Sequence, residues 1–339
     1  MNNKLFYKIS VLALSLVLIA CSGGTAEEEG CPEINDRQIN VVATTPMIGE
    51  FVSQVGGDNI SLTVLMPPEA DPHTYDPAPQ DAGKIADADL VFYTGLKYEP
   101  AALIKLLENS ACGAEVLAEV GENVYPIEFK EGGHDDHHDA HGEEGHDDEE
   151  GQDVHDDHAG HDHGVYDPHF WFDPNRVAYA AEYIESKLTE FDSSNAADYG
   201  TSADAFVSEL NDLSRRVSEL ISSVPSQNRK LITTHESLGY LEAKYGLEIL
   251  STIIPSLSSA NEISPAQLVD VIDVIEDNNI KVIFIEAEAP SVYAETLVAE
   301  TDIKAGTCLW VETLKENQSY ADFLISNVEL ITESLKDTD

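Results

Sequence analysis

Short apolar runs alternate with segments of helical spacing along most of the chain, first in its N-terminal third and again in its second half. The apolar runs are bounded by proline, glycine or polar residues, which is typical of buried parallel strands. They are residues 39–44, 61–66, 90–94, 230–234, 247–254, 281–286 and 307–311. The segments of helical spacing are residues 46–56, 77–87, 98–109, 237–245, 265–278, 291–301 and 319–335. Because strands and helices alternate, we expect an α/β fold of two lobes, each with a parallel sheet flanked by helices.

A long helical region, from about residue 175 to residue 224, separates the two sets of strands. Its second part carries one apolar stripe of residues three or four positions apart: Phe206, Leu210, Leu213, Val217, Leu220 and Ile221. Residues 195–200 interrupt the region. A helix of about 30 residues is roughly 45 Å long, which is enough to join two lobes as a rigid spine. We therefore predict a linking helix at residues 195–225, between an N-terminal lobe at 38–194 and a C-terminal lobe at 226–339.

Residues 1–20 have the order of a secretory signal peptide. Lys4 and Lys8 precede an apolar run that is too short to span a membrane comfortably, and small residues follow it. The run ends in Leu18-Ile-Ala-Cys21, which resembles a bacterial lipobox with Cys21 as the lipidated first residue of the mature chain. Residues 21–37 are small, acidic and without pattern, and we interpret them as a flexible tether. We expect an exported protein, anchored by its lipid on the extracytoplasmic face of the membrane, in the periplasm or at the cell surface.

The charge of the chain excludes anionic partners. Its 339 residues include 18 Lys+Arg and 64 Asp+Glu, which gives a net charge of -46 with histidine neutral. A protein with this charge repels nucleic acid and anionic lipid headgroups, and it concentrates cations. We therefore expect no nucleic-acid partner, and membrane attachment only through the N-terminal lipid.

Three cysteines remain in the mature chain beside Cys21. They are Cys31, Cys112 and Cys308, and none has the C-x-x-C spacing of a thiolate zinc site. Outside the cytoplasm an odd number of cysteines allows one disulfide and one spare thiol. We prefer the pair Cys31 and Cys112, because both fall on the side of the first lobe.

Residues 131–163 differ from the rest of the chain in composition. They contain nine histidines, 14 acidic residues and no lysine or arginine, without apolar periodicity. Such a segment cannot bury a core, so we predict a disordered loop that binds several metal ions weakly. A tolerated surface insertion without a role in transport is the alternative. The histidines of this loop are His134, His137, His138, His141, His146, His155, His158, His161 and His163.

Only three histidines lie in the rest of the chain, and two of them share a motif. His73 and His169 each follow Asp-Pro and are followed by an aromatic residue two positions on and a second Asp-Pro. Proline before each histidine disfavours a helix interior, so both imidazoles are expected on loops before a helix. The aromatic residue can wall a site, and a nearby aspartate or carbonyl can hold the second ring nitrogen. His235 ends a predicted strand, where α/β lobes bind ligands.

A carboxylate can complete a site formed by these three imidazoles. The two candidates are Glu286 and Glu312, each at the end of a predicted strand, and either could instead orient a ligand without contacting the metal. Three neutral imidazoles and a carboxylate suit zinc, and they also tolerate manganese. We expect His73, His169 and His235 to bind the metal in the cleft between the lobes, with either Glu286 or Glu312 as the carboxylate ligand.

The chain resembles the substrate-binding proteins of zinc and manganese ABC transporters over nearly all of its length after the tether. The resemblance rests on DPHTYDP at 71–77, DPHFWFDP at 167–174, TTHESLGYLEAKYG at 233–246, and CLWVETL with SYADFLISNVELI within 308–331. It implies that His73, His169 and His235 bind the metal, with histidine at the third position as in zinc-type members. The fourth ligand falls on Glu312, where aspartate is usual. It also implies two α/β lobes joined by one long helix, and partnership with a permease and its cytoplasmic ATPase. We expect a monomer.

Three functions other than that of a zinc receptor are alternatives for this sequence. A manganese-type receptor of the same family is the nearest alternative. A secreted zinc hydrolase needs an open coordination position and a general base, but His235-Glu236 is followed by Gly239 where an H-E-x-x-H motif has its second histidine. We therefore expect no enzyme and no catalytic residue. A surface metal-buffering protein or adhesin would use the histidine-rich loop alone.

Overall fold

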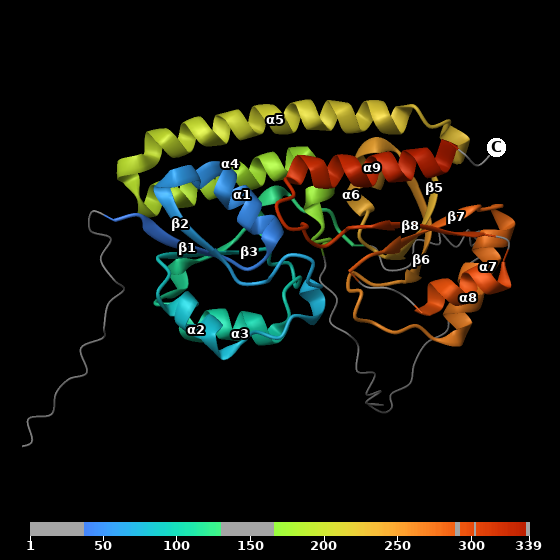
Figure 1. Ribbon diagram of the computed structural model, residues 1–339, viewed down its shortest axis with the longest axis horizontal. Helices are drawn as coiled ribbons and strands as arrows, with labels where there is room; N and C mark the ends of the chain where they lie inside the picture. Colours follow the sequence, from blue (N-terminus) through green and yellow to red (C-terminus); the bar gives the residue numbers. More distant parts are fainter. Residues whose placement is uncertain (1–36, 130–165, 289–291, 302, 337–339) are drawn as a thin grey trace, which may run out of the picture. The chain divides into compact units, whose positions relative to one another are not determined.

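Two four-stranded parallel sheets form the framework of the described part of the chain (Figure 1). The computed structural model describes residues 37–129, 166–288, 292–301 and 303–336, which lie in one compact unit. The first sheet has the order β2-β1-β3-β4, and the second has the order β6-β5-β7-β8. The strands are β1 (Ile39–Ala43), β2 (Ile60–Val64), β3 (Leu90–Tyr93), β4 (Leu117–Glu119), β5 (Lys230–His235), β6 (Glu248–Ile254), β7 (Val282–Glu286) and β8 (Lys304–Leu309). The predicted two-lobed α/β fold is confirmed.

Helices connect the strands of each sheet. The α-helices are α1 (Pro46–Gly56), α2 (Pro79–Ala86), α3 (Ala101–Ser110), α4 (Pro174–Phe191), α5 (Ala196–Ser222), α6 (Gly239–Tyr245), α7 (Pro265–Asp277), α8 (Val292–Glu300) and α9 (Tyr320–Lys336). Short 3-10 helices are η1 (Gly57–Asn59), η2 (Pro72–Thr74), η3 (Ala114–Val116), η4 (Gly121–Val124), η5 (Phe170–Phe172), η6 (Ser193–Asn195) and η7 (Ser226–Asn228). Several helices begin as the sequence suggests; α7, for example, has Ser264 as N-cap and Pro265 in its first turn.

The first sheet is buried on both faces, as its apolar strands require. Along β1, Val41 and Ala43 belong to the core that contains α1, α4 and α5, whereas Val42 belongs to the core that contains α2 and α3. Figure 1 shows α1 and α4 on one face of this sheet and α2 and α3 on the other. Successive residues of a strand point to opposite faces, so a strand covered on both sides reads as a continuous apolar run.

The second sheet follows the same rule. Leu231 and Phe284 pack into the large core that also contains α5 and α9, whereas Ile232 and Ile283 pack into a separate core with α7 and α8. The large core therefore contains residues of both sheets. Because this core is continuous, the carboxyl ends of the strands of both sheets are held by the same packed residues.

Helix α5 contacts helices of both lobes, namely α1 and α4 beside the first sheet and α6 and α9 beside the second. Its apolar stripe is largely buried, which agrees with the predicted packing. The interruption before it lies at Asp192–Asn195, slightly earlier than predicted. The cause is the Asp192 carboxylate, which accepts hydrogen bonds from Ser194, Asn195 and Tyr199 and so replaces helical bonds at that point.

The strands differ from the prediction in two places. Strand β8 ends at Leu309 rather than Val311, because the amide of Trp310 donates to Asn327 and the amides of Val311–Thr313 donate to Glu288. Strand β4, which has only three residues, was not predicted. A run this short carries too few apolar positions to reveal a period.

Several predictions fall outside the described residues. These are the signal peptide at 1–20, the tether with Cys21 and Cys31, and the histidine-rich loop at 131–163. Cys112 is disulfide-bonded, and Cys308 is free and exposed. The Cys31–Cys112 pairing therefore stays a prediction. Within the described ranges, no helix has the length and apolar character needed to cross a membrane.

Candidate metal centre

Three histidines and one glutamate from distant parts of the chain meet at one place. His73 lies in η2, His169 directly precedes η5, His235 is the last residue of β5, and Glu312 follows β8. Each offers one ligand atom, and these four atoms lie within 4.8 Å of one another. The side chains of His169, His235 and Glu312 are fully buried, and that of His73 is 4% exposed. The structure thus brings together the four residues that the sequence singles out.

The two Asp-Pro-His motifs adopt the same local turn. In each motif the aspartate accepts a hydrogen bond from the histidine amide two residues on, at 2.9 Å for both Asp71–His73 and Asp167–His169. Such an Asx turn, with proline between the partners, fixes the backbone of the histidine. Asp167 Oδ1 also lies 2.8 Å from His169 Nδ1. Because a carboxylate only accepts, this contact places the imidazole proton on Nδ1 and leaves Nε2 free for a metal.

Glu286 supports His235 rather than joining the four donors. Its carboxylate oxygens lie 2.6 and 2.7 Å from His235 Nδ1, so the proton of this imidazole is also placed on Nδ1. The Glu286 amide in turn donates to Thr234 Oγ1 at 3.1 Å. Of the two carboxylates that the sequence offered, Glu312 therefore faces the donors, and Glu286 orients an imidazole.

Glu312 is held by contacts on both its side chain and its backbone. Tyr98 Oη lies 2.9 Å from Glu312 Oε2 and 3.0 Å from the Glu312 carbonyl oxygen. Glu288 Oε1 accepts hydrogen bonds from the amides of Val311, Glu312 and Thr313 at 2.9, 3.0 and 3.3 Å. These contacts direct Glu312 Oε1 toward the three imidazoles.

The donor atoms themselves have no hydrogen-bond partners. His73 Nε2, His169 Nε2, His235 Nε2 and Glu312 Oε1 are all buried without one. His235 Nε2 lies 2.8 Å from Glu312 Oε1, and the other two Nε2 atoms lie 3.4 Å from it, but none of these pairs is aligned as a hydrogen bond. Buried polar groups nearly always have hydrogen-bond partners. Four converging ligand atoms without such partners are therefore consistent with a cation bound among them.

Aromatic rings enclose the four donors. Trp171, two residues after His169, has its ring centroid 5.5 Å from that imidazole, as the motif predicts. The matching residue of the first motif, Tyr75, packs against the core that contains α2 and α3. The Tyr75 hydroxyl bonds Asp81 and the carbonyl of Leu65. Tyr98 takes its place, with its ring centroid 4.9 Å from that of His73.

The charges of the site raise the pKa of two imidazoles, those of His169 and His235, when no metal is bound. For His169, burial is the largest effect and disfavours the proton, but Glu312 and Asp167 outweigh it and raise the pKa to about 9. For His235, burial is likewise outweighed by Glu286 and Glu312, which raise its pKa well above the usual range. Burial opposes ionisation of Glu312, but the neighbouring histidines lower its pKa well below the usual range. A metal cation must therefore displace protons from this site.

Sequence reasoning missed Tyr98 and Glu288. Tyr98 follows β3 at the carboxyl end of the first sheet, where ligand contacts are expected, but no motif distinguishes it. Glu288 lies two residues after β7 and acts through backbone amides, whose position no sequence pattern reveals.

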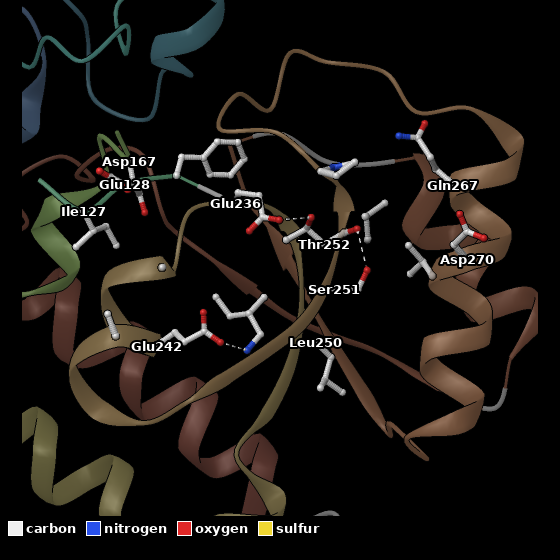
Figure 2. A pocket seen from close by; sticks show the side chains of 17 residues that line it. Ile127, Glu128, Asp167, Glu236, Glu242, Leu250, Ser251, Thr252, Gln267 and Asp270 are labelled. Carbon is white, nitrogen blue, oxygen red and sulfur yellow. Dashed lines mark hydrogen bonds between the residues drawn. The ribbon is translucent and has the colours of Figure 1, made fainter. Parts of the chain in front are cut away.

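An open pocket of about 540 Å³ lies next to the metal centre but does not contain it (Figure 2). Asp167, which holds His169, and Glu236, which follows His235, line this pocket, but none of the four donors does. Figure 2 shows the Glu236 carboxylate hydrogen-bonded to Thr252. The enclosed cluster, not this larger hollow, has the geometry of a metal site.

Comparison with known proteins agrees with the fold. The metal ABC transporter substrate-binding lipoprotein ScbA of Streptococcus cristatus is 24% identical over 340 residues, covering 98% of this chain and 99% of that protein. The zinc-binding lipoprotein AdcA of Streptococcus pneumoniae is 29% identical over 344 residues, covering 98% of this chain and 61% of that protein. The structure of the periplasmic zinc-binding protein TroA from Treponema pallidum superposes with a TM-score of 0.72 at 22% identity, covering 88% of this chain and 99% of that one.

Fold and donor set together define a two-lobed protein that binds a metal ion. The chain belongs to the family described as zinc-uptake complex component A, periplasmic, which matches residues 41–334. It is the substrate-binding component of a metal ABC transporter, a receptor and not an enzyme, and it acts with a permease and an ATPase. Its relatives are divided in their names between zinc, as in AdcA, and manganese, as in the lipoprotein MntA of Halalkalibacterium halodurans.

Proposed function

We propose that this protein captures zinc outside the cytoplasm and delivers it to an ABC permease for uptake. The ligands are His73, His169, His235 and Glu312. The observation that carries this proposal is the convergence of four buried donor atoms that lack any hydrogen-bond partner. Such unpaired groups are costly in a metal-free interior, and a bound cation would satisfy all four at once.

The donor set favours zinc over manganese. Three imidazole nitrogens and one carboxylate oxygen make a closed set of four, which is the usual number for zinc in a protein. Manganese is better served by more oxygen donors and by water, in sites of higher coordination number. The relatives named for manganese, such as MntA, make manganese the second candidate.

The N-terminal region serves as the anchor in this proposal. Cys21 carries the lipid, residues 21–37 form the tether, and the receptor acts as a monomer on the extracytoplasmic face of the membrane. Support comes from the Leu18-Ile-Ala-Cys21 sequence and from relatives that are named lipoproteins. We place the lobes at residues 38–194 and 226–339, joined by the helix at 195–225.

The histidine-rich segment at 131–163 is proposed as a weak accessory store of metal. Its nine imidazoles and 14 carboxylates can bind several ions, and its negative charge raises the local cation concentration. The described residues that flank the segment lie close to the metal centre, because Glu128 pairs with Tyr166, and the next residue, Asp167, holds His169. Metal bound there is thus collected close to the tight site.

Competition titrations with zinc and manganese test the choice of metal and ligands. The full chain should bind one zinc ion far more tightly than any other, and more tightly than manganese. His169→Ala should abolish that tight binding, whereas His137→Ala, which removes one imidazole of the accessory segment, should leave it intact. Unchanged tight zinc binding in His169→Ala would mean that the ligands lie elsewhere.

A further inference from the structure

We infer that Tyr98 determines the coordination number of the metal and thereby the preference of the site for zinc over manganese. This inference rests on the proposed function, in which Glu312 is a metal ligand. Tyr98 does not bind the metal in this account. It controls how many oxygen atoms Glu312 can offer.

The carboxylate of Glu312 has two oxygens in different surroundings. Oε2 lies 2.9 Å from Tyr98 Oη, whose one proton it shares with the Glu312 carbonyl oxygen at 3.0 Å, whereas Oε1 has no hydrogen-bond partner and faces the imidazoles. A carboxylate binds a metal through both oxygens only when both are free to turn toward it. With Oε2 held by the phenol, Glu312 offers a single oxygen, and the donor set closes at three nitrogens and one oxygen.

Tyr98 also keeps the site enclosed. Its side chain is almost fully buried, at 1% exposure, and its ring centroid lies 5.9 Å from that of His169 and 5.2 Å from that of Trp171. Water ligands would be needed to raise the coordination number of a manganese ion to six. A ring in this position limits their entry, so the phenol and the ring both favour a four-coordinate metal.

The backbone before Tyr98 is strained, which indicates that its position is selected. Gly95, Leu96 and Lys97 have φ angles of 77°, 52° and 64°, a left-handed conformation that costs energy for residues other than glycine. Buried Glu99 holds this turn by accepting hydrogen bonds from the amides of Thr94 and Gly95. Strain of this kind persists where the surrounding structure enforces it, most often at functional sites. Here its result is to direct Tyr98 into the metal centre.

The experiment compares Tyr98→Phe with Tyr199→Phe in the full chain. Each variant removes one hydroxyl from a buried tyrosine that donates to a carboxylate, because Tyr199 Oη donates to Asp192 at 2.8 Å, away from the donor cluster. Cobalt(II), added below one equivalent so that the tightest site fills first, reports the coordination number through its visible absorption. Zinc and manganese affinities are measured by competition, and thermal unfolding of the metal-free proteins verifies the fold.

We expect the unmodified protein and Tyr199→Phe to give the intense cobalt bands of a four-coordinate site. Tyr98→Phe should give the weaker bands of five or six coordination, with zinc affinity lower by about 10–100-fold and manganese affinity less affected. An unchanged cobalt spectrum and an unchanged zinc-to-manganese ratio in Tyr98→Phe would overturn the role of Tyr98 alone. Lack of tight zinc binding in the unmodified protein would instead overturn the proposed function. A five- or six-coordinate cobalt spectrum of the unmodified protein would contradict the inference even if Tyr98→Phe failed to fold.

Discussion

In two histidines of the metal centre, His169 and His235, the two ring nitrogens have different roles. In His169 and His235, Nδ1 contacts a carboxylate, and Nε2 is left without a hydrogen bond among the donors. The carboxylate fixes the tautomer and the ring orientation, and it makes Nε2 a stronger ligand. Residues that never touch the metal therefore influence how tightly it is bound.

Replacing Glu286 tests this influence. Glu286→Gln keeps the size of the side chain but removes the charge beside His235 Nδ1, so we expect zinc affinity to fall by about 10–100-fold without loss of the fold. Glu242→Gln is the matched control, because Glu242 is exposed and accepts a hydrogen bond from the Ile249 amide outside the cluster. Competition titration with a zinc chelator gives the comparison. Equal affinities of the two variants would show that Glu286 does not support the site.

Proton displacement gives the site a distinctive pH dependence. The pKa of His169 is raised to about 9 in the metal-free protein, above the ordinary value of about 6.5 for histidine. Protonated imidazole cannot bind zinc, so zinc affinity should keep rising as pH increases from 6.5 to 9. The slope is about tenfold per pH unit for each proton released.

Calorimetric titration of zinc in buffers of different ionisation enthalpy counts the released protons at each pH. At least one proton should be released at pH 7.5. An affinity that reaches its plateau near pH 7, with no proton release above that pH, would show that His169 titrates as an ordinary histidine.

The sequence could predict the three histidines of the cluster because their signals are local. The repeated Asp-Pro-His motif indicates two Asx turns, and His235 is placed by the end of an apolar strand. The residues alone could not decide between Glu286 and Glu312, because both lie at the ends of strands of the same sheet, and only the resemblance to the family favoured Glu312. The role of Tyr98 could not be predicted from the sequence for a different reason. Its contact with Glu312 joins residues 214 positions apart. It also depends on a left-handed turn before Tyr98 that no residue pattern predicts.

At the scale of elements, three of the four residues of the metal centre lie at or after the ends of parallel strands, whereas His169 precedes η5. His73 follows β2, His235 ends β5 and Glu312 follows β8, so the parallel direction of the strands gathers these segments at sheet edges. Strand and helix types were predictable because they follow the apolar period. Some element ends were not, because side chains such as Asp192 and Glu288 decide them by bonding to nearby polar groups or to distant backbone amides.

The left-handed turn after β3 is the element most sensitive to a small change. A Cβ at Gly95 would lie 1.9 Å from Glu119 Oε1, and its φ of 77° disfavours alanine. We expect Gly95→Ala to lower the free energy of unfolding of the metal-free protein by about 1–3 kcal/mol. It should also weaken zinc binding, because it displaces Tyr98.

Gly200→Ala in α5 is the control for Gly95→Ala. A Cβ at Gly200 meets nothing within 4 Å, so this variant should be more stable by about 1 kcal/mol through helix propensity. Urea unfolding measures both variants. A Gly95→Ala protein as stable as the parent would show that the turn is not under strain.

At the scale of the whole described unit, the donors come from both lobes. His73 and His169 belong to the part before α5, and His235 and Glu312 belong to the part after it. Direct hydrogen bonds also join these parts, for example from Trp171 Nε1 to the Val311 carbonyl at 2.8 Å and from Tyr320 Oη to the Trp171 carbonyl at 2.6 Å. The sequence predicted two lobes and a shared site, but not these contacts, since they depend on how the two sheets are oriented across the common core.

Zinc should therefore stabilise the protein by linking both lobes. A ligand that binds only the folded state at 1,000 times its dissociation constant adds about 4 kcal/mol, which appears as a higher unfolding temperature. A variant that lacks residues 134–163 should keep this stabilisation and one tight zinc ion, while the weaker ions of the segment are lost. The reason is that the segment must be ordered to bind metal, whereas the four donors are already in place. The full chain with His235→Ala is the control and should lose the stabilisation while keeping the weak ions. If deletion of the segment removes the tight zinc ion, primary ligands lie within residues 134–163, and the four-donor site is wrong.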